Sequence, residues 1–583
     1  MKIAKLALGL LLISAVSVSA AEPAPVAHPN WSFKEAGLIP VQSGGRVKPL
    51  DSLAREMILY ETGSRKFEGW DPVDLFLSLI AYPKSWDEKA FIQINREDVR
   101  RQLGLDEKRT RFAPHELFNN FALAQYAEYS GKKGQVEPPS VSQGKPKADL
   151  REEELKRVLD RLGTLRLIVS GDVWLVVPKA APAAWLSLAG TEPEGETIRS
   201  RFVTLLQSYM AGDEAAFNTA SIAARHAVEV QVPNWTTSME RSIRAESFYN
   251  RTRPFLIAWI LYATAALFWA FGIAGLEGRA AGTGGRFWSG MITFAKSLGA
   301  TAFLVHVGGI AFRCYVAGRP PVTNMYESIM WVSLGVVVFA AILYAIQKQA
   351  VGLIVAFTLA AFGLIAGDAA PAMMDPGIHP LVPVLRSNYW LTIHVLTITL
   401  GYAAFALTLG IANVTLFHFL KQHWNGVKSG AAHVAATQKI AALNQLTYRA
   451  MQFGVVLLAA GTILGGIWAD YSWGRFWGWD PKEVWALIAL LSYLVILHGR
   501  FTGWVKQFAY AAWTVVAFLS VVMAWYGVNF ILGVGLHSYG FSTGGRGWVA
   551  GFVGAQLAYV GFVTWIYWRA MSARAAGAKL QQA

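Results

Sequence analysis

Cysteine is almost missing from this chain: its 583 residues include a single one, Cys314, which lies in an apolar stretch. One cysteine cannot form an internal disulfide, a CxxC redox pair or a zinc site built on several thiolates. The C-x-x-C-H sequence that attaches heme covalently is excluded as well, because it needs two cysteines. Any heme on this chain would therefore be held by axial ligands and packing.

Charged residues are also scarce. They make up 15% of the chain, whereas about a quarter is usual in soluble proteins. Hydrophobic residues reach 54%, and the mean hydropathy is +0.35. This composition excludes an ordinary soluble enzyme and indicates a membrane protein. The net charge of +14 then fits Lys and Arg gathered in cytoplasmic loops, and we expect no nucleic-acid partner.

Residues 1–21 have the pattern of a secretory signal peptide. Lys2 and Lys5 give the positive end, an apolar run follows, and small residues form a cleavage site. An uncleaved anchor helix is the alternative, although the apolar run is short for spanning a membrane. In both cases we expect the following residues, 22–250, to lie outside the cytoplasm.

This second region has no apolar run of spanning length, and it predicts a mixed α/β domain in the periplasm. The polar, proline-rich run 131–150 predicts a loop. Residues 151–165 have the charge pattern of an amphipathic helix. Two short apolar runs, 165–170 and 173–177, flank a Gly-Asp pair and predict a β-hairpin.

From Pro254 onward, the chain consists mainly of long apolar runs. We count nine of spanning length and predict an all-α polytopic membrane domain over residues 251–583. The runs are 254–276, 292–317, 325–346, 350–368, 389–419, 447–471, 482–499, 507–531 and 549–571. If the first run starts outside, more Lys and Arg fall in inner loops than in outer ones, as the positive-inside rule requires. We therefore expect a multi-pass protein of the bacterial inner membrane.

One predicted outer loop, between the sixth and seventh runs, is rich in tryptophan. Residues 473–485 read WGRFWGWDPKEVW, with four tryptophans. Single tryptophans anchor helices at membrane surfaces, but four of them interleaved with glycine exceed that need. Trp473, Trp477 and Trp479 offer aromatic faces to a large planar ring, and Asp480 adds a polar group at its rim. We predict a binding surface for a porphyrin.

Heme held without covalent bonds needs axial ligands, and neutral imidazole is a common one. His394 lies near the outer end of the fifth run, and His537 lies in the outer loop after the eighth. Both are on the side of the tryptophan-rich loop, so we predict that they bind iron from opposite faces. His306 and His498 lie within spans, where ionisable residues are costly and often functional. The alternative for His394, His537 and His306 is a hydrogen-bonded structural histidine, and for His498 it is a residue that snorkels to the membrane surface from a helix end.

The tryptophan-rich loop matches WGxxWxWDxxExW, the signature of the WWD domain of heme-handling proteins. Within that superfamily, which includes CcmC and CcmF proteins, the chain resembles the CcsA/ResC type. Residues 318–328 are similar to that family's GxxPxxNxYES loop, and the segments around His394 and His537 also match. The resemblance covers roughly residues 290–570.

The resemblance implies assembly of c-type cytochromes by system II. It implies that His394 and His537 bind heme at an external site, and that His498 binds heme at an inner one. In fused synthases of this family the second inner ligand belongs to a CcsB-like half, which we do not expect in this chain. A separate CcsB/ResB-type partner or His306 would then supply it. Residues 42–51 are similar to a segment that precedes the CcsA-like half in such fusions.

The implied activity is that of a holocytochrome c synthase, or heme lyase. Heme b, bound non-covalently, would be a substrate in transit. Reduced apocytochrome c with a CxxCH sequence would be the second substrate, supported by a thiol-reducing pathway. Three alternatives stay open: heme delivery without ligation, a quinol-oxidising subunit with two bis-histidine hemes, and a solute transporter whose tryptophans are only anchors.

Overall fold

The computed structural model describes residues 24–136, 150–180, 183–277, 285–369, 374–380, 388–424, 430–532 and 545–582. The predicted signal peptide and His537 lie outside the described residues. The chain divides into two compact units. The first, here the amino-terminal unit, consists of Met1–Thr252, Tyr315–Gly318 and Gly377–Pro380. The second, here the membrane unit, consists of Arg253–Cys314, Arg319–Pro376 and Leu381–Ala583.

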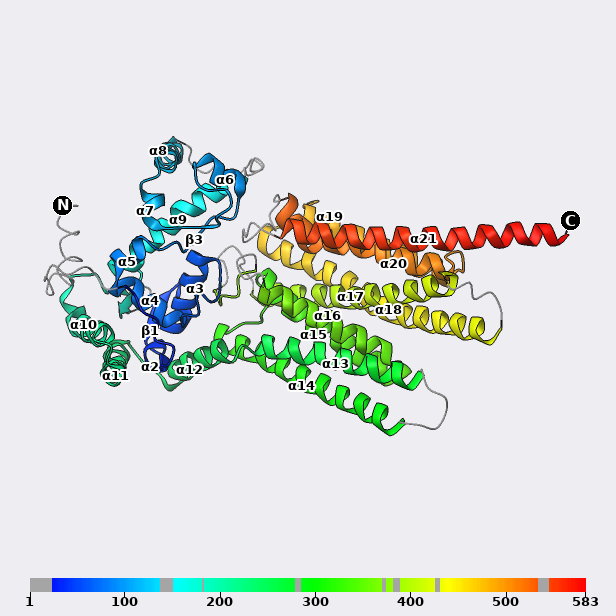
Figure 1. The fold of residues 1–583 in the computed structure, drawn as a ribbon, viewed down its shortest axis with the longest axis horizontal. Helices are drawn as coiled ribbons and strands as arrows, with labels where there is room; N and C mark the ends of the chain where they lie inside the picture. The colour runs from blue at the N-terminus through cyan, green and yellow to red at the C-terminus, as the bar shows by residue number, and fades with distance from the viewer. Residues whose placement is uncertain are drawn as a thin grey trace. The chain divides into compact units, whose positions relative to one another are not determined.

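Short helices dominate the amino-terminal unit (Figure 1). They are α2 (Lys34–Gly37), α3 (Leu50–Thr62), α4 (Pro72–Ala81), α5 (Pro83–Asp87), α6 (Glu97–Gln102), α7 (Pro114–Phe118), α8 (Phe121–Val136), α9 (Leu150–Ser170), η1 (Pro193–Gly195), α10 (Glu196–Met210), α11 (Glu214–Gln231) and α12 (Thr237–Thr252). Local signals set several starts. Asp71 accepts a hydrogen bond from the Val73 amide at the start of α4, with Pro72 as the first helical residue.

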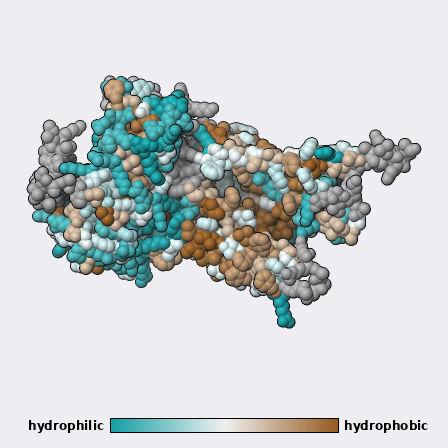
Figure 2. Space-filling model, in the orientation of Figure 1, coloured by the Kyte–Doolittle hydropathy of each residue, from teal (hydrophilic) through white to brown (hydrophobic). Residues whose placement is uncertain are grey.

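The strands of this unit form three two-stranded antiparallel sheets. They pair β1 (Pro40–Ser43) with β2 (Arg46–Pro49), β3 (Ile92–Gln93) with β4 (Arg111–Phe112), and β5 (Leu175–Val177) with β6 (Leu186–Ser187). Aromatic packing fills the core: the rings of Phe76 and Trp174 stack at 5.1 Å with an interplanar angle of 16°. Figure 2 shows hydrophilic residues on the amino-terminal unit and apolar ones on the membrane unit.

The predicted hairpin over residues 165–177 is wrong. Residues 165–170 continue α9, which ends before Gly171 at a φ of +79°. The buried positions on α9 are three or four residues apart, which is a helical period, and they continue through the segment: Leu155, Val158, Leu162, Leu165 and Ile168. The second run does contain a strand, β5, but it pairs with β6. The predicted loop 131–150 also begins later, because α8 runs to Val136; residues 137–149 lie outside the described part.

The membrane unit consists of long helices (Figure 1). They are α13 (Pro254–Glu277), α14 (Gly285–Ala317), α15 (Met325–Gln347), α16 (Ala350–Ala369), α17 (Asn388–Trp424), α18 (Ala431–Trp473), α19 (Pro481–Phe501), α20 (Gln507–Val522), the π-helix η2 (Met523–Leu532) and α21 (Arg546–Gln582). Nine helices among the described residues are long and apolar enough to cross a membrane, with α20 and η2 counted as one. The nine long apolar helices that the sequence predicts are confirmed as candidate spans.

Glycine residues bring α17 and α18 into close contact. A Cβ added to Gly401 would lie 2.9 Å from the Leu458 backbone nitrogen, and one added to Gly461 would lie 2.7 Å from the Ile398 Cα. Small residues at such crossings let helix backbones approach each other inside a membrane. This region of close approach, which we call the α17–α18 seam, also contains Gly465 and His394.

Candidate functional site

His394 lies on α17, two turns from its start, and faces α18. Its Nδ1 is 2.8 Å from the carbonyl oxygen of Gly461. A carbonyl can only accept a hydrogen bond, so Nδ1 carries the proton and Nε2 of the neutral ring carries the lone pair. Gly465 makes room for the ring, because a Cβ there would lie 2.6 Å from the imidazole Cε1. The seam thus fixes the tautomer in which Nε2 can bind a metal.

An indole lies parallel to this imidazole. The ring of Trp468, on α18, is 6.3 Å from the His394 ring with an interplanar angle of 6°, and the side chain is only 1% exposed. Trp473 packs edge-on against Trp468 at 4.7 Å. Leu391, Trp468 and Ala469 form a small buried cluster. Sequence reasoning missed Trp468, although its position five residues before Trp473 on the same helix is a usable signal.

A capping box orders the tryptophan-rich loop where it enters α19. Asp480 is the N-cap residue, and its carboxylate accepts a hydrogen bond from the Lys482 amide at 3.1 Å. Glu483 reaches back and accepts from the amides of Gly478 at 2.8 Å and Asp480 at 3.1 Å. These bonds satisfy amides that a helix start leaves without partners. Through these contacts Asp480 stabilises the conformation of the loop at the start of α19.

The capping box holds Trp479 in a strained conformation. Its φ is +57°, a region that residues with a Cβ rarely adopt, and its side chain is 71% exposed. Strain of this kind persists only where the surroundings impose it, and it concentrates at functional sites. The rings of Trp477 and Trp479 lie 6.0 Å apart at 89°. Because they are perpendicular, they cannot both lie face-on against one flat ring, and the predicted shelf of three tryptophans is not a single plane.

Arg475 places a positive charge inside this loop. Its guanidinium lies 5.8 Å from the Trp473 ring centre and 3.9 Å from the Glu483 carboxylate. It also occupies the space that a side chain on Gly478 would need. Sequence reasoning did not give Arg475 a role, although it is the only cation of the WGRFWGWD stretch. It is a candidate contact for an acidic group of a ligand.

A buried ion-pair network orders the GxxPxxNxYES segment. Glu327, fully buried on α15, accepts from Arg313 at 2.9 Å, from Arg319 at 3.0 Å, and from both the amide and the hydroxyl of Thr323 at 2.9 Å. Asn324 caps α15 by accepting from the Glu327 amide at 2.8 Å. Removing one partner of a buried pair costs about 3–5 kcal/mol. The motif therefore builds a rigid connection between α14 and α15.

Hydrogen bonds link this network to the end of the eighth span. The indole of Trp525, in η2, donates to the Ser328 hydroxyl at 3.1 Å. Lys482 of α19 donates to Asn529 of η2 at 3.4 Å. A π-helix is rare and often marks a functional position. These bonds tie η2 to α15 and α19. His537 follows η2 in the sequence and lies outside the described residues.

The two histidines within spans are not brought together. His306, fully buried on α14, uses Nε2 to bond the Met330 carbonyl at 3.0 Å and packs edge-on against Phe255 and Tyr262. His498, exposed near the end of α19, uses Nδ1 to bond the Leu494 carbonyl of its own helix at 2.8 Å. In Figure 1, α14 and α19 lie toward opposite edges of the membrane unit. His306 and His498 therefore do not face each other.

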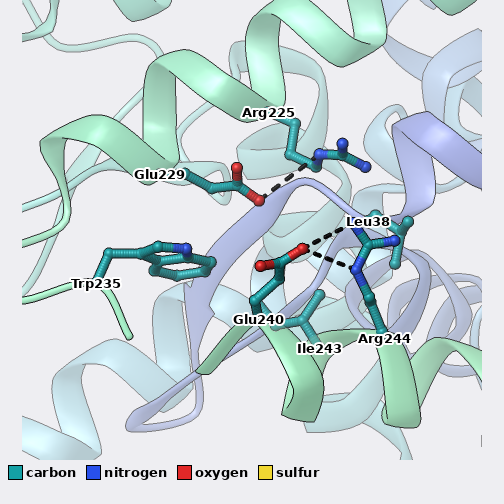
Figure 3. A pocket seen from close by; sticks show the side chains of 7 residues that line it. All are labelled: Leu38, Arg225, Glu229, Trp235, Glu240, Ile243 and Arg244. Carbon is teal, nitrogen blue, oxygen red and sulfur yellow. Dashed lines mark hydrogen bonds and ion pairs between the residues drawn. The ribbon is translucent and has the colours of Figure 1, made fainter. Parts of the chain in front are cut away.

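A small cavity in the amino-terminal unit does not fit a porphyrin (Figure 3). It is an open hollow whose empty space, open solvent included, is only about 170 Å³. Its charged side chains are paired within the chain: Arg225 with Glu35 and Glu229, and Glu240 with Arg244. Burial raises the pKa of Glu229, and the Arg225 charge opposes this shift.

Comparison with known proteins gives the family. The family model described as "Cytochrome C assembly protein" matches residues 322–537, which include Glu327, the seam and the tryptophan-rich loop. The chain is 32% identical to "Cytochrome c biogenesis protein CcsA" of Synechococcus sp. (strain CC9902) over 269 residues, which is 42% of this chain and 86% of that protein. This chain belongs to the CcsA family of cytochrome c assembly proteins. The family resemblance predicted from the sequence is confirmed.

Two further relatives match different lengths of the chain. CcsA of Chlamydomonas reinhardtii is 35% identical over 231 residues, covering 39% of this chain and 62% of that protein. "Protein NrfI" of Wolinella succinogenes is 30% identical over 519 residues, covering 85% of this chain and 53% of that protein. The similarity to NrfI thus takes in much of the amino-terminal unit, and the chain spans about half of NrfI. Membership of the family supports a role of this chain in cytochrome c biogenesis.

Proposed function

We propose that this CcsA-type chain holds heme b at the outer ends of its spans and presents it for attachment to the CxxCH cysteines of apocytochrome c. The observation that carries the proposal is the pairing of His394 with Trp468 at the seam. A backbone carbonyl fixes Nδ1, the lone pair is on Nε2, and a buried indole lies parallel to the ring. Metal-binding histidines use the same arrangement, in which one nitrogen donates to a carbonyl and the other binds.

The surrounding residues suit a large, flat and partly acidic substrate. His394 and His537 would hold the iron of heme from its two faces. Trp473, Trp477 and Trp479 would contact different edges and faces of the ring, because their planes differ. Arg475 carries the charge that complements the two carboxylates of heme. Asp480 keeps the loop in place through the cap of α19.

The chain would promote ligation by holding the two reactants together. Each cysteine S–H of the apocytochrome adds across one vinyl C=C bond of heme: the sulfur bonds one carbon, the hydrogen goes to the other, and nothing leaves. Fixing the ring against the peptide lowers the entropic part of the barrier. The cysteines must be reduced for this addition, so the reaction depends on a thiol-reducing pathway.

The inner site needs a second membrane chain. His498 is exposed and has its lone pair on Nε2, and Leu491 and Val495 on the same stripe of α19 are also exposed. His306 lies on another helix and uses its Nε2 for a structural hydrogen bond. These observations favour a CcsB/ResB-type partner as the source of the second inner ligand. The chain would work in the bacterial inner membrane with its amino-terminal unit in the periplasm.

The test is the absorption spectrum of purified chain, with and without the co-expressed partner. We expect heme in the wild type, reduced in His394→Ala and in His537→Ala, and holocytochrome only when the partner is present. Full heme in both variants would overturn the outer site. Bound heme without any holocytochrome, even with the partner, would favour heme delivery without ligation.

A further inference from the structure

Helix α17 packs between two partners of the membrane unit, α18 on one face and α15 on the other. The residues that it turns toward α18, at the seam, are His394, Ile398 and Gly401. The residues that it turns toward α15 are Leu396, Leu400 and Ala403. Each residue of the second set follows one of the first by two positions, which is a rotation of about 200° in an α-helix. The two contacts therefore lie on nearly opposite faces of α17.

Trp331, on α15, makes the contact nearest to the histidine. Its indole N–H donates to the carbonyl oxygen of Leu396 at 3.3 Å. A helix carbonyl has a second lone pair beside the one used in its helical bond, so it can accept this hydrogen bond without opening the turn. Trp331 thus holds the turn of α17 that begins at His394, from the side away from the seam.

One turn further along α15, Gly335 lets the two helices come close. A Cβ added there would lie 2.8 Å from the Cβ of Ala403 and 2.9 Å from the Cδ2 of Leu400. Positions 331 and 335 share one face of α15 because they are four residues apart. Their partners on α17 advance in the same direction along the chain, so the two helices run parallel. We call this contact the α15–α17 interface.

The start of α15 is itself firmly held. The buried ion pairs of Glu327 with Arg313 and Arg319 lie one turn before Trp331. On the same helix, Ser328 accepts a hydrogen bond from the indole of Trp525. The ring of Trp525 also packs against Tyr402 of α17, at 6.0 Å. Two tryptophans therefore tie α17 to a helix whose start is fixed by buried charges.

We propose that Trp331 is a positioning residue for the outer heme site. The bond from Nδ1 of His394 to the Gly461 carbonyl needs α17 at one height and one rotation against α18. Trp331 restrains both from the opposite face, because it bonds the backbone two residues beyond His394. Without this bond α17 can slide or turn at the seam, and Nε2 then moves away from the position in which it binds iron. This inference rests on the proposed function and adds a residue that acts through α17 rather than on heme.

The experiment uses the full chain with its partner and compares Trp331→Phe with Trp269→Phe. Phenylalanine keeps an aromatic ring but cannot donate to the Leu396 carbonyl. Trp269, which is 2% exposed on α13 and packs against Tyr344 and Phe357, is the matched control. The readouts are the heme retained after purification, without and with added imidazole, and the thermal unfolding midpoint. We expect Trp331→Phe to retain about two- to tenfold less heme than Trp269→Phe, within the range that coupling between sites produces.

Imidazole and a double variant separate positioning from folding. Added imidazole can take the place of a displaced His394, so it should restore heme in Trp331→Phe. In a His394→Ala background with imidazole present, Trp331→Phe should cause no further loss, because no histidine is left there to position. A loss that imidazole does not reverse, or a further loss in that background, would overturn the inference. Equal heme in Trp331→Phe and Trp269→Phe would overturn it as well.

Gly335→Ala tests the same interface if Trp331→Phe does not accumulate. The added methyl group pushes against Leu400 and Ala403 of α17, so it should cause the same imidazole-reversible loss. Gly308→Ala on α14 is its control, because no atom of the described residues lies within 4 Å of the added Cβ. Equal heme in these two variants would contradict the inference. If heme in the wild type does not depend on His394, the proposed function itself fails.

Discussion

Two regions of the membrane unit hold a histidine against a backbone carbonyl, and they do so through opposite ring nitrogens. At the α17–α18 seam, His394 gives Nδ1 to Gly461, which puts the lone pair on Nε2 beside Trp468. Between α13, α14 and α15, His306 gives Nε2 to Met330 and is fully enclosed. The two rings are therefore opposite tautomers, with the lone pair on Nε2 in His394 and on Nδ1 in His306. How the neighbouring helices pack decides which ring nitrogen bonds the carbonyl.

The largest expected effect is the contrast between His394→Ala and His306→Ala. His394→Ala should abolish holocytochrome formation in cells, because the proposed function makes His394 an axial ligand of the heme iron. His306→Ala should keep it and lower only the stability, by about 1–3 kcal/mol, because the hydrogen bond to the Met330 carbonyl and the packing of the buried ring are lost. For both variants, the measurement is the yield of heme-stained cytochrome divided by the amount of chain in the membrane. Equal loss in the two variants would erase the distinction between the regions.

The second-largest loss of heme is expected when residue 465 gains a side chain. Gly465→Leu places atoms where the His394 ring lies, so the ring must move or the helices must separate. Overpacking of this kind costs about 1–3 kcal/mol, and we expect most heme to be lost. Gly308→Leu on α14 is the matched control, because nothing lies within 4 Å of its added Cβ. The heme content of the two purified variants tests this prediction. Similar heme contents in both would mean that the axial ligand of the iron is not His394.

Trp468→Leu should have an intermediate effect. It removes the indole that packs beside His394 and Trp473 but leaves the imidazole and its hydrogen bond. We expect heme affinity to fall by about tenfold, in the range of 0.5–1.5 kcal/mol known for aromatic pairs plus the loss of buried area. Titration with heme measures it, and Trp548→Leu is the control, since Trp548 is 84% exposed. An unchanged affinity in Trp468→Leu would remove the indole from the site.

The smallest effect is expected at the cap of α19. Asp480→Ala removes an N-cap acceptor, which costs about 1 kcal/mol, and it relaxes the strained backbone at Trp479. Asp480→Asn keeps an oxygen that can accept and should stay close to wild type. The unfolding midpoint and the rate of holocytochrome formation report both changes. A large loss in Asp480→Asn would show that the charge acts on the substrate and is more than a cap.

The sequence was sufficient to predict the long apolar helices and to locate the tryptophan-rich loop. Long apolar runs have few alternatives in a membrane protein, and a cluster of tryptophans between two of them is visible without coordinates. The hairpin over residues 165–177 failed because a short apolar run next to a glycine is compatible with both a strand and the last turns of a helix. Only the burial of Leu165 and Ile168 on the same side as Leu155 distinguishes them.

The chemistry of the histidines could not be predicted in this way. Which ring nitrogen of His394 or His306 is protonated depends on a carbonyl of another helix, far away in sequence. The same holds for Trp468, whose role follows from its contact with α17. Motifs name residue types at a spacing, whereas the tautomer and the parallel ring are set by how helices pack.

A structure of the heme-loaded chain tests the central claim most directly. We predict that Nε2 of His394 binds the iron while Nδ1 stays on the Gly461 carbonyl, with Trp468 alongside and His537 on the opposite face. Iron bound to another histidine of the chain, or bound through Nδ1 of His394 with the Gly461 bond broken, would contradict it.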